Sequence, residues 1–172
     1  LAPLGDEYGK LLDRAFTQGW IDVYENKGKR SGAYSWGCYG AHPYVLLNYQ
    51  KTMHDVFTIA HELGHAMHSY YSNSTQPYAK AEYKIFVAEV ASTVNEVLLV
   101  RHMLSTAEGE RKKYLLSYLL DMFRTTVFRQ TQFAEFEYEA HKMAEEGKPM
   151  SAESLCEIYK KLNDKYYITE GV

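Results

Sequence analysis

The stretch that decides the fold is Phe57-Thr58-Ile59-Ala60-His61-Glu62-Leu63-Gly64-His65-Ala66-Met67-His68-Ser69. Its apolar residues recur at the spacing of one helix face, and the capping-box sequence Thr52-Met53-His54-Asp55 just before it marks the start of a helix. On that helix, His61 and His65 lie on the same face with Glu62 beside them. Two imidazoles aimed at one point, next to a carboxylate, make half of a zinc site with a base attached.

Glu62 is the predicted general base. Zinc lowers the pKa of a bound water from 15.7 towards ~7, and a carboxylate next to a metal ligand can reach that water. It can take the proton of the water and later hand it to a leaving amine. The predicted reaction class is therefore metal-assisted hydrolysis.

A third ligand must come from another segment, because a catalytic zinc normally takes three protein ligands. The motif helix should end near Tyr71, and a second helix over about residues 79–103 should return beside it. A rise of about 10 Å after the motif and ~15 Å along the returning helix brings Glu89 level with the histidines. The same arithmetic places Glu82 too early and Glu96 about 10 Å too far.

The sequence around these positions supports the pairing of the two helices. The neighbours of Glu89 are the apolar residues Phe86, Val87, Val90 and Ala91, where an isolated carboxylate would be costly, so a solvated carboxylate is the less favoured interpretation. Gly64 costs about 1 kcal/mol relative to Ala inside a helix. Its presence indicates that another backbone comes close, with chance as the alternative.

Two other histidines fit the metal site less well. His68 follows His65 on the same face, but its rise of about 10.5 Å from His61 is too long for three ligands at ~2.1 Å from one ion. We therefore expect His68 to line the site or to be structural. His42 has no spacing relation to the motif, and a structural role is the simpler interpretation.

The rest of the chain predicts a mainly α fold with a small β ribbon. Further helices are expected at about residues 6–24, at residues 105–146 after a second capping sequence, and at residues 151–163. Residues 31–49 are rich in Gly, Tyr and Trp, and residues 44–49 are the strand candidate. No repeat, low-complexity tract or linker interrupts the sequence, so residues 1–172 are predicted to form one domain.

Composition excludes some partners. A net charge of -3 without a Lys/Arg block gives no electrostatic reason to expect nucleic acid or an anionic membrane, and no apolar run approaches the ~18 residues of a span. Cys38 and Cys156 lack a C-x-x-C neighbour and are interpreted as reduced thiols of a cytoplasmic protein. The opening Leu-Ala-Pro is typical of an internal start.

Three segments resemble the thimet oligopeptidase and oligoendopeptidase F zinc peptidases, and the likeness is closer to the latter. Residues 28–34 resemble the family's glycine-rich stretch, residues 57–69 its metal helix, and residues 86–96 its third-ligand helix. The resemblance implies a zincin-like helical core with one zinc ion on His61, His65 and Glu89, and Glu62 as the base. It also implies cleavage of short unstructured peptides.

The resemblance extends to substrate binding. It implies that residues 43–49 are the edge strand that pairs with an extended substrate, with a core strand as the alternative. Substrate contacts are predicted from Tyr34, His42, Tyr44 and His68.

The resemblance also implies that the chain is incomplete. The family's downstream Tyr and His residues, which stabilise the oxyanion, would lie beyond Val172. The chain is therefore interpreted as a catalytic-core fragment of a longer peptidase, with the rest of the parent chain packed on it. Alone it is expected to bind zinc but to have weak or no activity. A related zinc carboxypeptidase and a non-catalytic zinc-binding domain are the alternatives to an oligopeptide endopeptidase.

Overall fold

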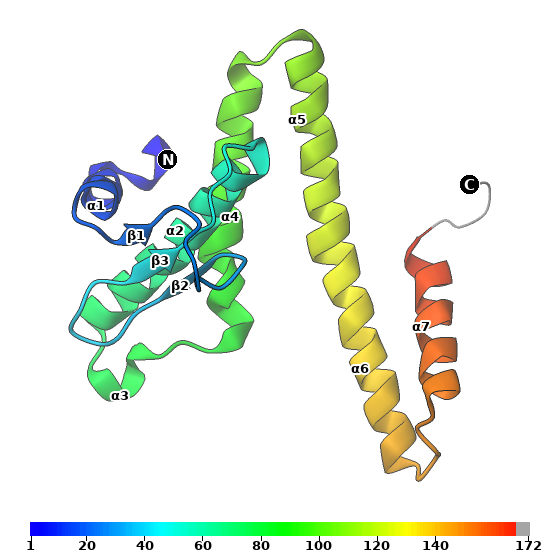
Figure 1. Cartoon of the computed structure of the whole chain (residues 1–172). Coiled ribbons are helices and arrows are strands. Elements are labelled where there is room, and N and C mark those ends of the chain that lie inside the picture. Colours follow the sequence, from blue (N-terminus) through cyan, green and yellow to red (C-terminus); the bar gives the residue numbers. More distant parts are fainter. Residues whose placement is uncertain (168–172) are drawn as a thin grey trace. The chain divides into compact units, whose positions relative to one another are not determined.

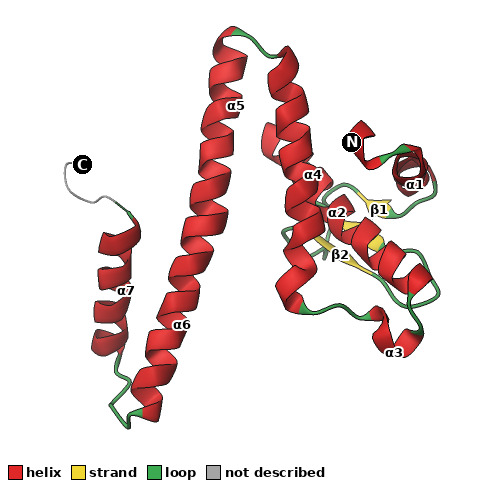
Figure 2. Cartoon of the chain, turned by 180° about the vertical axis from the view of Figure 1, so that it is seen from behind, coloured by secondary structure: helices red, strands yellow, loops and turns green. Residues whose placement is uncertain are grey.

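The computed structural model of the chain describes residues 1–167 (Figure 1). The fold is mainly helical with one small sheet, which confirms the predicted fold class (Figure 2). The chain divides into two compact units, Leu1–Thr106 and Ala107–Val172. A single domain over residues 1–172 stays a prediction.

The first unit contains the predicted metal motif. Its elements are η1 (Ala2–Leu4), α1 (Asp6–Thr17), β1 (Ile21–Asp22), β2 (Tyr34–Trp36), β3 (Tyr44–Leu46), α2 (Met53–Thr75), α3 (Tyr78–Ala81) and α4 (Ile85–Thr106). α1 ends earlier than predicted, because Gly19 turns the chain with a φ of 75°. Trp20 therefore leaves the helix and lies buried in the core.

The three strands form one sheet in the order β1-β3-β2. β3 lies in the middle, parallel to β1 and antiparallel to β2. The expectation that residues 43–49 form an edge strand is therefore wrong, because β3 already has a partner on each side. β2 pairs with no second strand among residues 1–167, so its outer side is an open edge.

α2 begins as predicted, with a reciprocal capping box. The Thr52 hydroxyl accepts from the Asp55 amide at 3.2 Å, and the Asp55 carboxylate accepts from the Thr52 amide at 2.8 Å. The helix continues past its expected end to Thr75. The hydroxyls of Ser74 and Thr75 donate back to the Tyr71 carbonyl, so these turn-forming residues are accommodated on the last helical turn.

The core of the first unit joins α1 and the sheet to α2. It is formed by Leu11, Ala15, Trp20, Val45, Leu47, Leu63, Ala66 and Met67. A buried amide links three helices, because Asn95 on α4 donates to the Ala60 carbonyl at 3.1 Å and to the Tyr8 hydroxyl at 2.9 Å. α2 therefore packs against both the sheet and α4.

The second unit is helical in the part that the structure describes. Its elements are α5 (Gly109–Met122), the π-helical segment η2 (Phe123–Phe128), α6 (Arg129–Glu145) and α7 (Ala152–Tyr166). The predicted cap at residue 105 is wrong, because α4 continues through Ser105 and α5 has Glu108 as its N-cap. Gln132 on α6 donates to Asn163 on α7 at 2.8 Å.

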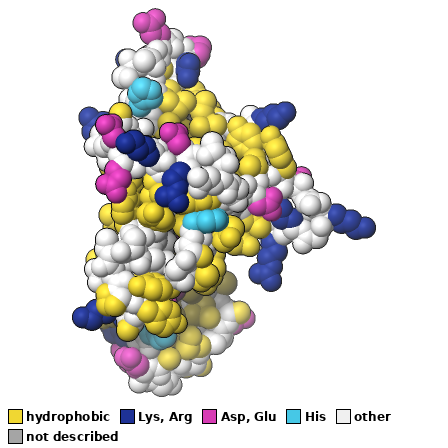
Figure 3. Space-filling model, turned by 90° about the vertical axis from the view of Figure 1, so that its left-hand side faces the viewer, with side chains coloured by type: hydrophobic (Ala, Val, Ile, Leu, Met, Phe, Trp, Pro, Cys, Tyr) yellow, Lys and Arg dark blue, Asp and Glu magenta, His cyan; other side chains and the backbone are white. Residues whose placement is uncertain are grey.

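Several apolar side chains stay on the surface. Ile85 and Phe86, at the start of α4, are 89% and 92% exposed. Figure 3 shows hydrophobic side chains exposed between charged ones on the face that it presents. Within residues 1–167, no helix combines the length and apolarity needed to cross a membrane.

Candidate metal centre

Three predicted ligands converge at one point of the first unit. α2 presents the Nε2 atoms of His61 and His65, which lie 3.1 Å apart. α4 presents Oε2 of Glu89, at 3.2 Å from His61 Nε2 and 3.3 Å from His65 Nε2. In the part of the chain that the structure describes, this is the one group of His, Cys, Asp and Glu side chains with metal-binding spacing.

The triangle fits a small tetrahedral cation. Ligand atoms at ~2.0–2.2 Å from a tetrahedral centre lie about 3.3–3.6 Å from one another, close to the separations in this group. Two histidine nitrogens and one glutamate oxygen are also a donor set of catalytic zinc sites, where a fourth position stays open. The donor atoms are therefore suited to zinc.

The close approach of α4 to α2 at Gly64 positions Glu89, the predicted third ligand. A Cβ atom at Gly64 would lie 2.5 Å from Cα of Ser92 and 2.7 Å from the carbonyl oxygen of Ala91, so only glycine fits. This confirms the predicted backbone approach. Ser92 is fully buried, and its hydroxyl donates to Oε2 of Glu89 at 2.9 Å. The helix contact therefore also orients the Glu89 side chain.

Two premises behind the prediction of Glu89 are wrong, although the residue lies in the group. The returning helix starts at Ile85, after α3 and a short connector, and not near residue 79. α2 is also longer than expected, so both differences leave the helical return too short, and the segment between Thr75 and Ile85, not helical rise, brings Glu89 level with the histidines. The Glu89 side chain is 64% exposed and its apolar neighbours are on the surface. The expected cost of a carboxylate among these neighbours therefore does not apply.

Replacing Gly64 with Ala should destabilise the protein by about 1–3 kcal/mol, because the added methyl group overpacks the α2–α4 contact. Gly9 in α1 is the matched control, since nothing lies within 4 Å of a Cβ atom there. Gly9→Ala should stabilise the protein by up to about 1 kcal/mol through helix propensity. Urea unfolding of both variants measures the difference, and equal shifts would contradict the packing argument.

The two histidines have different electrostatic surroundings. Burial lowers the pKa of His61, but the hydrogen bond and charge of Glu96, with the charges of Glu89 and Glu62, raise it above the usual value. Burial also lowers the pKa of His65, and there the opposing charge of Glu89 does not restore it. The lowered pKa favours the neutral form of His65, which is the form that binds a metal.

Glu62 is buried, at 7% exposed, and faces the backbone amide of Ser35 on β2. Burial raises the pKa of the Glu62 carboxyl, and the charges of Glu89 and Glu96 raise it further. The charge of His61 and the hydrogen bond from the Ser35 amide lower this pKa, but the net shift is upward. No group within residues 1–167 hydrogen-bonds the buried Oε2 of Glu62. A carboxylate with a raised pKa and a free oxygen is suited to accept a proton.

Three predicted substrate contacts are not members of the converging group. Val45 packs on α2, and residues that alternate with it on the sheet point to the opposite face. Tyr34 and Tyr44 lie on that opposite face, 47% and 55% exposed. The His42 ring stacks on Trp20 at 4.8 Å between ring centroids, which gives it a packing role. Substrate binding by these residues stays a prediction.

His68 lies one turn beyond His65 and contacts the connector before α4. Its ring stacks on Tyr83 with ring centroids 3.7 Å apart, and the Tyr83 hydroxyl is 2.9 Å from the Ser69 hydroxyl. Burial lowers the pKa of His68, and its buried Nδ1 finds no hydrogen-bond partner in the described part of the chain. This packing fits the structural role that was the alternative for His68, and a place in the site wall or a substrate contact stays a prediction.

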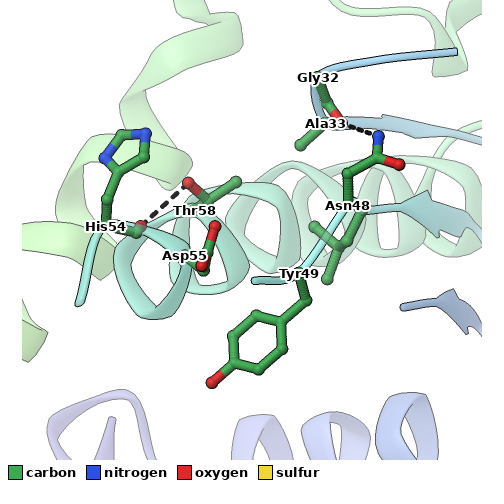
Figure 4. A pocket seen from close by; sticks show the side chains of 8 residues that line it. Gly32, Ala33, Asn48, Tyr49, His54, Asp55 and Thr58 are labelled. Atoms are coloured by element: carbon green, nitrogen blue, oxygen red, sulfur yellow. Dashed lines mark hydrogen bonds between the residues drawn. The ribbon is translucent and has the colours of Figure 1, made fainter. Parts of the chain in front are cut away.

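A separate pocket of about 220 Å³ lies beside the first turns of α2 (Figure 4). It is lined by Gly32, Ala33, Leu47, Asn48, Tyr49, His54, Asp55 and Thr58. The Asn48 amide donates to the carbonyls of Arg30 and Gly32 at 2.9 and 2.8 Å, which ties the glycine-rich loop to the end of β3. None of the three converging ligands lines this pocket, so it is distinct from the metal group.

Sequence reasoning missed two neighbours of the site. Glu96 hydrogen-bonds Nδ1 of His61, although the helix arithmetic placed it too far away to act as a ligand. Glu96 follows Glu89 by seven residues, which is two turns on the same face of the helix. This spacing could have indicated that Glu96 also faces the histidines of α2. The amide of Ser35 faces Glu62, but a backbone contact between a strand and a helix leaves no mark in residue types.

Comparison with known proteins places the chain in a family context. A model of peptidase family M3 matches residues 4–172. The chain is 52% identical to Oligopeptidase PepF of Bacillus subtilis (strain 168), over 97% of this chain and 25% of that protein. It is 48% identical to the chromosomal Oligoendopeptidase F of Lactococcus lactis subsp. cremoris, over 97% of this chain and 28% of that protein.

Solved structures agree with the observed fold. A crystal structure from Chlamydophila abortus, of a protein provisionally assigned as a peptidase, superposes with a TM-score of 0.80 at 52% identity, over 97% of this chain and 28% of that one. PZ peptidase A with an inhibitor gives a TM-score of 0.77 at 20% identity, over 98% and 30%, which is a likeness of fold alone. The chain spans about a quarter of the length of the curated relatives that it matches.

Proposed function

The chain belongs to peptidase family M3, and from this premise we propose that it carries the metal centre of a zinc-dependent oligoendopeptidase. The proposed reaction is the hydrolysis of short unstructured oligopeptides by a zinc-activated water. The observation that carries the proposal is the triangle of His61, His65 and Glu89 beside the buried Glu62. Cys38 and Cys156 are both free, which supports a cytoplasmic location.

The proposed mechanism assigns one task to each side chain of the group. When bound by His61, His65 and Glu89, zinc would supply a Lewis acid that lowers the pKa of a water and polarises the scissile carbonyl. Glu62 takes a proton from the attacking water and delivers it to the leaving amine. Its raised pKa favours both steps, because the protonated carboxyl must exist between them.

We further propose that the substrate binds along the open edge of β2. The Val45 amide donates to the Trp20 carbonyl beside β1, so it points away from β2. In an antiparallel pair, the opposite residue Ser35 then points its own amide away from β3, towards the outer edge of the sheet. Glu62 lies against this same amide. An extended peptide that pairs there through main-chain hydrogen bonds would lie next to the base, whatever its sequence.

Internally quenched peptides with both termini blocked test the proposed reaction. An oligoendopeptidase cleaves them, whereas a zinc carboxypeptidase requires a free terminal carboxylate. The assay compares this chain with a polypeptide extended to the length of the curated relatives. We expect slower turnover by the shorter chain if, as the family resemblance implies, oxyanion donors lie beyond Val172, since loss of one donor costs ~10²–10³ in rate. Bound zinc without turnover in the longer polypeptide would instead favour a non-catalytic zinc-binding domain.

A further inference from the structure

The Glu96 carboxylate lies on the far side of the His61 imidazole from the metal group. Oε1 of Glu96 hydrogen-bonds Nδ1 of His61, while Nε2 of the same ring faces Glu89 and His65. Glu96 is therefore not a fourth member of the converging group. Its side chain is only 16% exposed, and a carboxylate at such a position is costly unless it is hydrogen-bonded.

The bond to Glu96 determines which nitrogen of His61 is free. A carboxylate oxygen only accepts hydrogen bonds, so Nδ1 must carry the proton that it shares with Glu96. In the neutral ring, Nε2 then has the lone pair that a metal requires. The same contact also restrains rotation of the ring.

α4 orients the second histidine from the same side. The backbone of Ala88 hydrogen-bonds the His65 ring, and the carbonyl of Ala88 is the accepting group. Because Nε2 of His65 faces Glu89, the nitrogen left for this carbonyl is Nδ1. One short part of α4 therefore supplies the predicted third ligand and, for each histidine, an outer partner, which is a group that hydrogen-bonds the ring nitrogen facing away from the metal group.

We propose that Glu96 is a positioning residue, which holds His61 in the tautomer and ring orientation that present Nε2 to the metal. This inference rests on the proposed function, in which that metal is zinc. Outer partners of this kind typically change metal affinity by 10–100-fold when removed. Glu96 differs from Glu62 in its task, because it has no contact with the reacting atoms.

Two substitutions separate the hydrogen bond of Glu96 from its charge. Glu96→Ala removes both, and zinc affinity should fall by 10–100-fold. Glu96→Gln keeps a carbonyl oxygen that can accept from Nδ1, so it should recover most of the lost affinity. Glu82→Ala, an exposed glutamate before α4, is the matched control and should bind zinc like the unchanged chain. Competition with a chromogenic chelator measures all four proteins, with circular dichroism as the check on folding.

The tautomer of His61 provides a readout that needs neither zinc nor activity. Nitrogen NMR of the metal-free chain, at a pH where the ring is neutral, should show the His61 proton on Nδ1. Glu96→Gln should retain this tautomer and Glu96→Ala should lose it. A proton on Nε2 in the unchanged chain, or unaltered zinc affinity in folded Glu96→Ala, would overturn the inference. Failure of the unchanged chain to bind zinc would instead overturn the proposed function and leave the tautomer result to stand on its own.

Discussion

Replacing Glu62 with Gln should abolish peptide hydrolysis while zinc stays bound. The substitution keeps the size of the side chain and all three ligands, but the amide cannot take up the proton of the attacking water. General-base catalysis contributes ~10²–10⁴-fold, so turnover should fall by at least two orders of magnitude. The measurement is kcat/KM on a quenched peptide together with zinc stoichiometry, in a polypeptide with the length of the curated relatives.

The buried position of Glu62 makes a control for folding necessary. Oε2 already has no hydrogen-bond partner within residues 1–167, so a Gln amide there adds no broken bond at that atom. Thermal unfolding should confirm an intact fold, and Glu82→Gln is the exposed control. A Glu62→Gln variant that retains more than about 10% of turnover would exclude Glu62 as the general base.

Zinc affinity should fall by more than about 100-fold when Glu89 is replaced with Gln. Loss of a ligand should exceed the 10–100-fold effect of losing an outer partner, and an uncharged amide is a poor substitute for a carboxylate on zinc. Because the Glu89 side chain is 64% exposed, the fold should be unaffected. Chelator competition on the purified chain measures the change.

The exposed Glu82 again provides the comparison for Glu89. Glu82→Gln should leave zinc affinity unchanged, since Glu82 lies before α4 and outside the converging group. A Glu89→Gln variant with one tightly held zinc would show that the exposed carboxylate only neighbours the histidines. The third ligand would then have to come from another residue.

The features that the sequence predicted best depend on local spacing. The helical repeat places His61 and His65 on one face, and the capping box at Thr52 defines the start of their helix. Gly64 also predicted correctly that another backbone approaches, because a glycine inside a helix has a cost that needs a reason. Each of these inferences uses residues within a few turns of one another.

The features that the sequence did not predict depend on contacts between distant segments. The central position of β3 is decided by the strand that pairs on each side, which the residues of β3 alone do not specify. The exposure of Glu89 follows from which face of α4 meets α2, and the apolar neighbours of Glu89 suggested the opposite. Ser105 resembled a cap but lies inside α4, since its hydroxyl bonds a carbonyl of its own helix.

The pairing of α2 with α4 at Gly64 also bears on the order of folding. The predicted metal ligands lie within 29 residues of chain, from His61 to Glu89, so few residues must be ordered to bring them together. By contrast, Tyr8 and Asn95 meet across 87 residues. Because local contacts form faster than distant ones, we expect the helical hairpin to form first and α1 to dock later. In a nascent chain, the metal ligands would then be assembled before the unit around them is complete.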